Sequence, residues 1–397
     1  MVTIQPARPA EAAFELSLIR GDALFRLQRR LGLIPPDGLG LVRRAVFWSM
    51  FAWLPIALWA VYADRAMPGV AGEPLLAHFG IHARFLVAVP LLILAEGPAH
   101  ALSARFLACF VQSGTVPPAE MGRFRAVVAA TARLRDATLP WIAMAGLVVA
   151  FTTTSEIVHH SHEVDWVAES PPTGWPGFGA LWYLYVGRVI YLTLVLAWLW
   201  RAVLLTVLLW RIARLDLALV PTHPDRAGGL GFLERVPAVF APVALAIGCV
   251  VAARWAHDAV YHGLVLQSLR VEMVAFVVAA LVVFLLPLAA FAGPFKRAKR
   301  QALLDYGALV GRHGRLVRER WIEGKALDDD AVLSAPELGP VADTVAAYDA
   351  VKAMRTVPVG KAAIVPLAAA AAVPMIAVLA IQMPIKDLAV KLLKALL

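Results

Sequence analysis

Seven separate runs of apolar residues, each about 18 to 23 residues long, constrain this sequence more than any other feature. An α-helix rises about 1.5 Å per residue, so a run of this length crosses the roughly 30 Å hydrocarbon core of a bilayer. The composition agrees, because 60% of the 397 residues are hydrophobic and only 16% are charged. About a quarter of the residues are charged in a typical soluble domain. We therefore predict an all-α protein, a polytopic transmembrane helical bundle of about seven spans.

The seven predicted spans divide the chain into four parts. Residues 1–44 form a cytoplasmic amphipathic segment, 45–292 a six-span bundle, 293–361 a cytoplasmic helical segment, and 362–397 a seventh span with a short outer helix. Prolines inside several runs predict kinks and do not exclude helix, because packed neighbours can satisfy the freed carbonyls. By residue number, the predicted spans are 45–63, 85–104, 137–155, 178–200, 237–255, 271–292 and 362–383.

The distribution of positive charge predicts the orientation of the chain. When the loops are assigned to alternate sides, 29 of the 37 Lys and Arg residues fall on one side. Cytoplasmic loops of membrane proteins carry such an excess. We therefore place the N-terminus in the cytoplasm and the C-terminus outside. The net charge of +9 then reflects a basic surface that faces anionic lipid, and we expect no nucleic-acid partner.

The second predicted span carries an unusual set of polar residues. With 100° of rotation per residue, Glu96 shares a helix azimuth with His78, and His82 and His100 lie about 40° away. An ionisable residue inside a bilayer faces protein or water and is by default a candidate for ion or proton handling. The alternative is a structural carboxylate that pairs with Arg188 or another basic group.

Arg188 lies deep in the fourth predicted span. A guanidinium in the membrane needs a carboxylate, a carbonyl group or an anionic substrate as its partner. Glu96 and Glu272 are the candidate carboxylates. A structural ion pair and a contribution to a transport path both remain open for this residue.

Seven of the ten histidines map to the predicted outer side, with several acidic residues among them. Imidazoles and nearby carboxylates could complete a zinc or copper site. The same histidines could also sense external pH or occupy ordinary interfacial positions. The outer candidates are His78, His82, His159, His160, His162, His257, Asp258 and His262.

A glycine-rich loop precedes the fifth predicted span. The amides of Gly228, Gly229 and Gly231 could bind a phosphate or another anion ahead of the following helix. The Lys-Ser/Thr pair of a P-loop and the strand of a dinucleotide-binding fold are both missing from the surrounding sequence. A tight turn into the fifth span is the competing interpretation.

Two stretches carry a resemblance to a known group of proteins. HARFLVAVPLLILAE at residues 82–96 and HPDRAGGLGFL at residues 223–233 resemble uncharacterised multi-pass membrane proteins of proteobacteria. The resemblance implies a location in the bacterial inner membrane and brings no function with it.

Three function classes follow from these features. The first is a channel or transporter for a small ion or proton that uses Glu96, His100 and Arg188. The second is a membrane scaffold, sensor or assembly factor without catalysis, with a cytoplasmic protein partner bound through residues 295–360. The third is a membrane-embedded redox or metal-binding protein that holds Zn or Cu. Contact with the lipid bilayer is expected in every case, and a homo-oligomer is compatible with each. A membrane-embedded enzyme belongs to the third class, and the sequence favours a protein that is not an enzyme.

Overall fold

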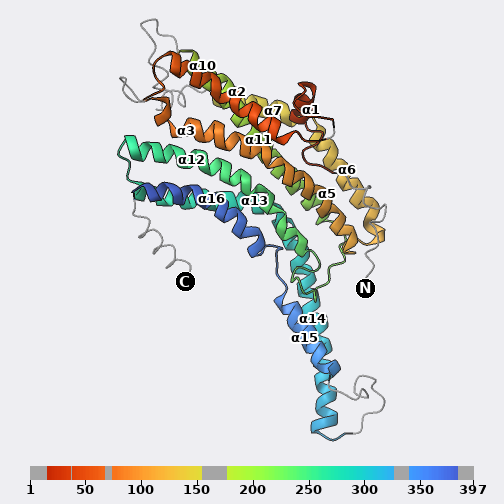
Figure 1. The fold of residues 1–397 in the computed structure, drawn as a ribbon. Coiled ribbons are helices and arrows are strands. Elements are labelled where there is room, and N and C mark those ends of the chain that lie inside the picture. The colour runs from red at the N-terminus through yellow and green to blue at the C-terminus, as the bar shows by residue number, and fades with distance from the viewer. Residues whose placement is uncertain (1–15, 37, 68–73, 154–176, 326–338, 383–397) are drawn as a thin grey trace, which may run out of the picture.

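A computed structural model describes residues 16–36, 38–67, 74–153, 177–325 and 339–382 (Figure 1). Every regular element in these ranges is helical. Seven of the described helices are long and apolar enough to cross a membrane. The prediction of an all-α polytopic bundle is confirmed, and the chain is an integral membrane protein.

Each span of the first half is built from one helix or from several consecutive helical segments. A short helix, α1 (Ala23–Arg30), precedes them. The first span is α2 (Leu41–Tyr62), and a 3₁₀ turn, η2 (Leu75–Ala77), follows it. The second span consists of α3 (Phe79–His82), η3 (Ala83–Ala88), α4 (Val89–Leu94) and α5 (Glu96–Gln112). The third consists of η4 (Pro118–Glu120), α6 (Met121–Asp136) and α7 (Leu139–Thr153), and the fourth of α10 (Phe178–Trp182), η5 (Tyr183–Gly187) and α11 (Arg188–Ile212).

The second half follows the same pattern. The fifth span consists of η6 (Gly231–Arg235), η7 (Pro237–Phe240) and α12 (Ala241–Tyr261). The sixth begins with η8 (Leu266–Leu269) and continues through α13 (Arg270–Leu285), η9 (Leu286–Phe291), α14 (Ala292–Val317) and η10 (Arg318–Ile322). After α15 (Gly339–Ala353), α16 (Lys361–Gln382) forms the seventh span.

The bundle has two unlike ends (Figure 1). We call one the arginine-rich end. It begins at the level of α1, which lies beside the start of α2 and the last turn of α6, where Arg135 donates to the Ser17 carbonyl. It continues to the ends of α5 and α11 and the start of α6, which lie farther along the bundle. We call the other the histidine-bearing end, where α3 and α10 begin and α12 ends. The fourth span reaches the arginine-rich end at Ile212, twelve residues beyond its predicted limit. Its last turns remain helical because they are still apolar and pack in the core, as the burial of Leu205 and Leu209 shows.

The second and fourth spans meet closely at two π-helical segments, η3 and η5. A Cβ atom added to Gly187 in η5 would lie 2.5 Å from Cζ of Phe85 in η3, so only glycine fits there. The Phe85 and Tyr183 rings lie 6.0 Å apart in an edge-on arrangement, and Arg84 donates a hydrogen bond to the Tyr183 hydroxyl. Ser49 of α2 donates to the Phe85 carbonyl at 2.6 Å. These contacts fix the irregular part of the second span.

Helix α14 leaves the bundle and pairs with α15 to form a projecting helical hairpin (Figure 1). The residues between them, 326–338, lie outside the described residues, as does the predicted outer helix after residue 382. At the base of the hairpin, Lys299 donates to the Lys352 carbonyl at 2.9 Å. Arg355 pairs with Glu234, and its backbone amide donates to the Arg226 carbonyl at 2.8 Å. The hairpin is therefore fastened to the loop that precedes the fifth span.

Candidate functional site

The most polar part of the interior is a group of four charged residues from four segments. Glu96 is the first residue of α5, Arg44 lies in the first turn of α2, and Arg201 lies midway along α11. Asp22 is the N-cap residue of α1. Glu96 is 0% exposed, and the other three are 3% exposed or less. We call these four residues the ion-pair cluster.

Glu96 is at the centre of the ion-pair cluster. Its Oε2 accepts a hydrogen bond from Arg44 Nη1 at 2.6 Å, and its Oε1 accepts one from Arg201 Nη2 at 2.9 Å. Arg201 Nη2 also lies 3.0 Å from Asp22 Oδ2. Two guanidinium groups and two carboxylates give a formally neutral cluster. Charge balance and mutual hydrogen bonding are the conditions under which buried charges are tolerated.

Neutral groups complete the surroundings of the arginines. Arg44 Nε donates to the side-chain oxygen of Gln28, and Arg44 Nη1 donates to the Leu39 carbonyl at 3.3 Å. The guanidinium of Arg201 lies 4.9 Å from the centre of the Trp198 ring, in a cation–π arrangement. The indole N–H of Trp198 donates to the Leu92 carbonyl at 2.8 Å. The ion-pair cluster thus joins residues 22–39 to the first, second and fourth spans.

Asp22 has two structural roles. Its Oδ1 accepts the backbone N–H of Phe25 at 2.6 Å, which caps α1, and its Oδ2 accepts Arg201. Burial raises the pKa of the Asp22 carboxyl above its ordinary value, and Glu96 raises it further, although Arg201 and the Phe25 amide act in the opposite direction. Asp22 therefore takes up a proton more readily than an exposed aspartate does.

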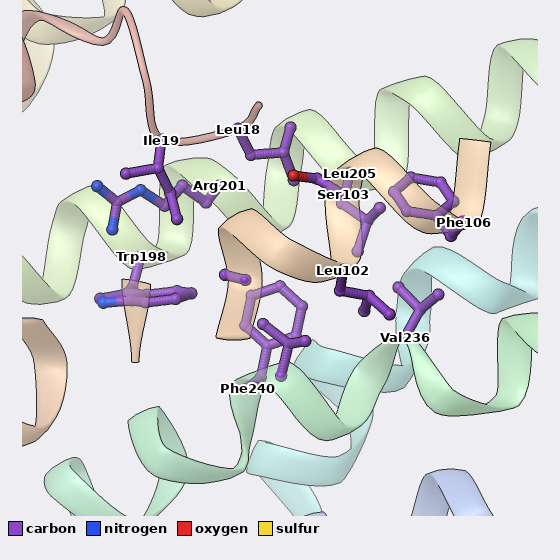
Figure 2. Close-up of a pocket in the computed structure, with 12 residues that line it drawn as sticks. Leu18, Ile19, Leu102, Ser103, Phe106, Trp198, Arg201, Leu205, Val236 and Phe240 are labelled. Atoms are coloured by element: carbon purple, nitrogen blue, oxygen red, sulfur yellow. The ribbon is translucent and has the colours of Figure 1, made fainter. Parts of the chain in front are cut away.

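A small cavity of about 20 Å³ lies beside the ion-pair cluster. Figure 2 shows Arg201 and Trp198 at one side of this cavity, with Ser103 and apolar side chains around the rest of it. The volume corresponds to about one water molecule. Arg201 Nε is buried and makes no hydrogen bond. This cavity could hold a single small molecule such as water, and it is too small for a larger substrate.

The four candidates of the intramembrane site do not form one group. Glu96 belongs to the ion-pair cluster. His100 Nδ1 lies 2.8 Å from Oγ of Ser17, in the N-terminal segment that also contributes Asp22 to the ion-pair cluster. Arg188 is half-buried at the start of α11, and Glu272 is exposed in the first turn of α13. The arginines that bind Glu96 are Arg44 and Arg201. The sequence did not identify either arginine as a partner of Glu96. The predicted first span begins at residue 45 and the predicted fourth span ends at residue 200, so both arginines were assigned to loops.

The histidines His78 and His82 do not share a helix face with Glu96. His78 precedes α3 with φ −83° and ψ 78°, which is not helical. The π-helical segment η3 then separates His82 from Glu96, and a rotation of 100° per residue does not apply across it. The Trp53 indole donates to His82 Nδ1 at 3.1 Å, and His82 Nε2 lies 3.1 Å from the Leu75 carbonyl. Since an indole N–H only donates and a carbonyl only accepts, these partners select the neutral tautomer with its proton on Nε2.

Three of the outer candidates gather at the histidine-bearing end. The rings of His78 and His257 stack at 5.0 Å, and His262 lies 5.3 Å from His257. His257 Nδ1 is 2.9 Å from the Ala77 carbonyl. The backbone carbonyl of Asp258 accepts the amide of His262 at 3.0 Å. Within the described ranges, no group of three or more His, Cys, Asp or Glu residues is arranged to hold a metal ion. His159, His160 and His162 lie outside those ranges.

The glycine-rich loop is organised around the carboxylate of Asp225. Its oxygens accept the backbone amides of Ala227, Gly229 and Gly231 at 2.7, 3.3 and 2.8 Å. Burial raises the pKa of Asp225, but these three amides and His223 outweigh that effect and hold the pKa below its ordinary value. Gly228 and Gly229 adopt positive φ values of 63° and 92°, as the tight turn requires. The amides of Gly229 and Gly231 therefore already bind an anionic group of the protein itself, the carboxylate of Asp225.

No protein-family model, curated protein or solved structure matches the chain.

Replacement of Glu96 by Gln should destabilise the protein strongly. Glu96→Gln keeps the size of the side chain but leaves two buried arginines with one carboxylate, and breaking a buried pair in this way costs about 3–5 kcal/mol. Glu272→Gln, in an exposed first turn, is the matched control and should change stability by less than about 0.5 kcal/mol. Thermal unfolding in detergent measures both variants. Equal unfolding temperatures for the two would contradict a stabilising role for the ion-pair cluster.

Proposed function

We propose that this chain is an inner-membrane scaffold of a bacterium, in which seven spans anchor the α14–α15 hairpin in the cytoplasm for a protein partner. The positive-inside rule supports the orientation, because the predicted cytoplasmic segments contain 29 of the 37 Lys and Arg residues. The bacterial inner membrane is part of this proposal, because it is the location that the resemblance to multi-pass membrane proteins of proteobacteria implies. The C-terminus is then periplasmic.

The single observation that carries the scaffold proposal is the exposed apolar tip of the hairpin. Trp321 and Ile322 are 64% and 78% exposed. They follow α14, a helix of 26 residues that is roughly 39 Å long. Phe295 in its first turn is buried in the core, and the later turns project from the bundle, so lipid that surrounds the spans does not cover Trp321 and Ile322 (Figure 1). An exposed tryptophan beside an apolar residue is typical of a protein-binding surface, where aromatic side chains supply much of the binding energy.

The position of Glu96 also favours a scaffold over a transporter. Both carboxylate oxygens of Glu96 already accept hydrogen bonds from arginines, and the side chain has no exposed area. A group that carries ions or protons must exchange them with water from each side of the membrane in turn. The adjacent cavity holds about one water molecule. This geometry supports a structural role for Glu96 in holding the bundle together.

Photo-crosslinking from the hairpin tip tests the scaffold proposal. A photoreactive amino acid in place of Ile322 should crosslink one cytoplasmic protein in cells, and Trp321→Ala should reduce that product by roughly thirtyfold, because truncation of a central interface tryptophan costs about 2 kcal/mol or more. The control carries the photoreactive group at Tyr62, an exposed residue at the opposite end of the first span. The scaffold proposal fails if position 322 yields no product, or the same product as position 62.

A channel or transporter for a proton or small ion is the second candidate. The placement of the ionisable residues Glu96 and Arg201 within apolar spans favours it, since such residues commonly mark ion pathways. Vesicles containing the purified protein should then show a flux that Glu96→Gln abolishes and Glu272→Gln retains. Wild-type vesicles that conduct no more protons, Na⁺ or K⁺ than empty vesicles would exclude this candidate.

A further inference from the structure

A second cavity, of about 180 Å³, lies in the N-terminal segment at the arginine-rich end. Three arginines line it, Arg20, Arg26 and Arg29, together with the apolar side chains of Phe25 and Ile34. We call it the arginine pocket. It is distinct from the ion-pair cluster, because the three arginines are exposed whereas Arg44 and Arg201 are buried.

The local fold brings these arginines together. Arg26 and Arg29 are three residues apart on α1 and so lie on the same face of the helix. The helix ends in a Schellman motif, in which the Leu33 amide donates to the Gln28 carbonyl at 3.0 Å and the Gly32 amide donates to the Arg29 carbonyl at 3.1 Å. Gly32 takes the required positive φ of 71°. The chain therefore turns back after α1, and Ile34, Pro35, Pro36 and Gly38 line the other side of the pocket.

Among the residues that the structure describes, those that line the arginine pocket carry unbalanced positive charge. Arg26 Nη1 donates to the Gly21 carbonyl at 2.7 Å. In the described part of the chain, none of the three arginines forms an ion pair, and no acidic side chain lines the pocket. The carboxylate of Asp136, which lies beside Gly21, is paired with Arg135 at 2.8 Å. The pocket is therefore suited to a ligand that carries negative charge.

The arginine pocket lies at the depth of the lipid headgroups. Gly38 lines the pocket, and the first span begins at Leu41 only three residues later. Three residues of extended chain cover at most about 11 Å. On α1, Leu27 and Leu31 are 53% and 58% exposed and lie one helical turn apart, as expected of side chains that reach the acyl region beside an interfacial helix.

We propose that the arginine pocket binds the phosphate group of an anionic phospholipid headgroup. A guanidinium offers up to five N–H donors in a planar array that matches the oxygens of a phosphate, and two or three such groups can surround one phosphate. Basic residues at the end of a span are attracted to anionic lipid at the same depth. The apolar Phe25 and Ile34 provide contacts for the glycerol and the first methylenes of the lipid.

Native mass spectrometry of the full-length protein, released from nanodiscs of equimolar phosphatidylcholine and phosphatidylglycerol, tests this assignment. Wild-type protein should retain phosphatidylglycerol in preference to phosphatidylcholine. The pocket variant Arg20→Gln, Arg26→Gln, Arg29→Gln should retain about tenfold less, since each arginine at the lipid surface contributes to anionic lipid binding. The matched control, Arg30→Gln, Arg43→Gln, Arg297→Gln, removes three exposed charges outside the pocket, and its retention should fall by about twofold or less, because salt screens distant charges.

Three outcomes would overturn the assignment. Equal loss of phosphatidylglycerol in the pocket variant and the control would mean that general surface charge, and not the arginine pocket, holds the lipid. Equal retention of the two lipids by the wild type would remove the anionic preference. Displacement of phosphatidylglycerol by inorganic phosphate, added in molar equivalence to the lipid, would show that the pocket is a site for free phosphate. The ion-pair cluster is intact in both variants, so the thermal unfolding temperature should stay close to that of the wild type.

Discussion

The carboxylate of Glu96 lies between the guanidinium groups of Arg44 and Arg201, in a part of the bundle that solvent does not reach. A charge in such a place persists only if opposite charges and hydrogen bonds replace the water that it has lost. Asp22 supplies the second negative charge that the two arginines require. Because the four residues come from four separate segments, the electrostatic requirement of one carboxylate fixes the relative positions of the N-terminal segment and three spans.

The arrangement of the arginine-rich end follows from this constraint. Asp22 caps α1 and binds Arg201 at once, so α1 is held against the bundle in one orientation. Ser17 adds a contact to His100 on α5. The exposed face of α1 then carries the arginine pocket. The hairpin is fastened at the same end through Arg355, which pairs with Glu234 and binds the Arg226 carbonyl. A few short segments thus connect the buried ion-pair cluster with the exposed arginine pocket and the projecting hairpin.

The spans could be predicted from the sequence because an apolar run of fixed length has few other stable structures in a protein. Glu96 stood out for a related reason, since a carboxylate in such a run is rare. The partners of Glu96 did not stand out in the same way. Arg44 and Arg201 were assigned to loops by the charge rule, although the apolar residues that continue past Arg201 indicated that it lies inside a helix. The predicted stripe of His78, His82 and Glu96 assumed a regular helix, and the π-helical segment η3 removes that regularity. No sequence pattern reveals that Asp22, outside the spans, would fold onto Arg201.

Hydrogen exchange at the backbone amides of α1 tests most directly whether the ion-pair cluster holds the N-terminal segment in place. Asp22→Asn removes the charge that binds Arg201 and keeps a side-chain oxygen that can still cap α1. A hydrogen bond between charged groups contributes about 1.5–3 kcal/mol, so the exchange of residues 23–30 in nanodiscs should become about ten to a hundred times faster. Asp305→Asn, on the exposed surface of α14, should leave that rate unchanged. Equal exchange of α1 in the two variants would contradict this account.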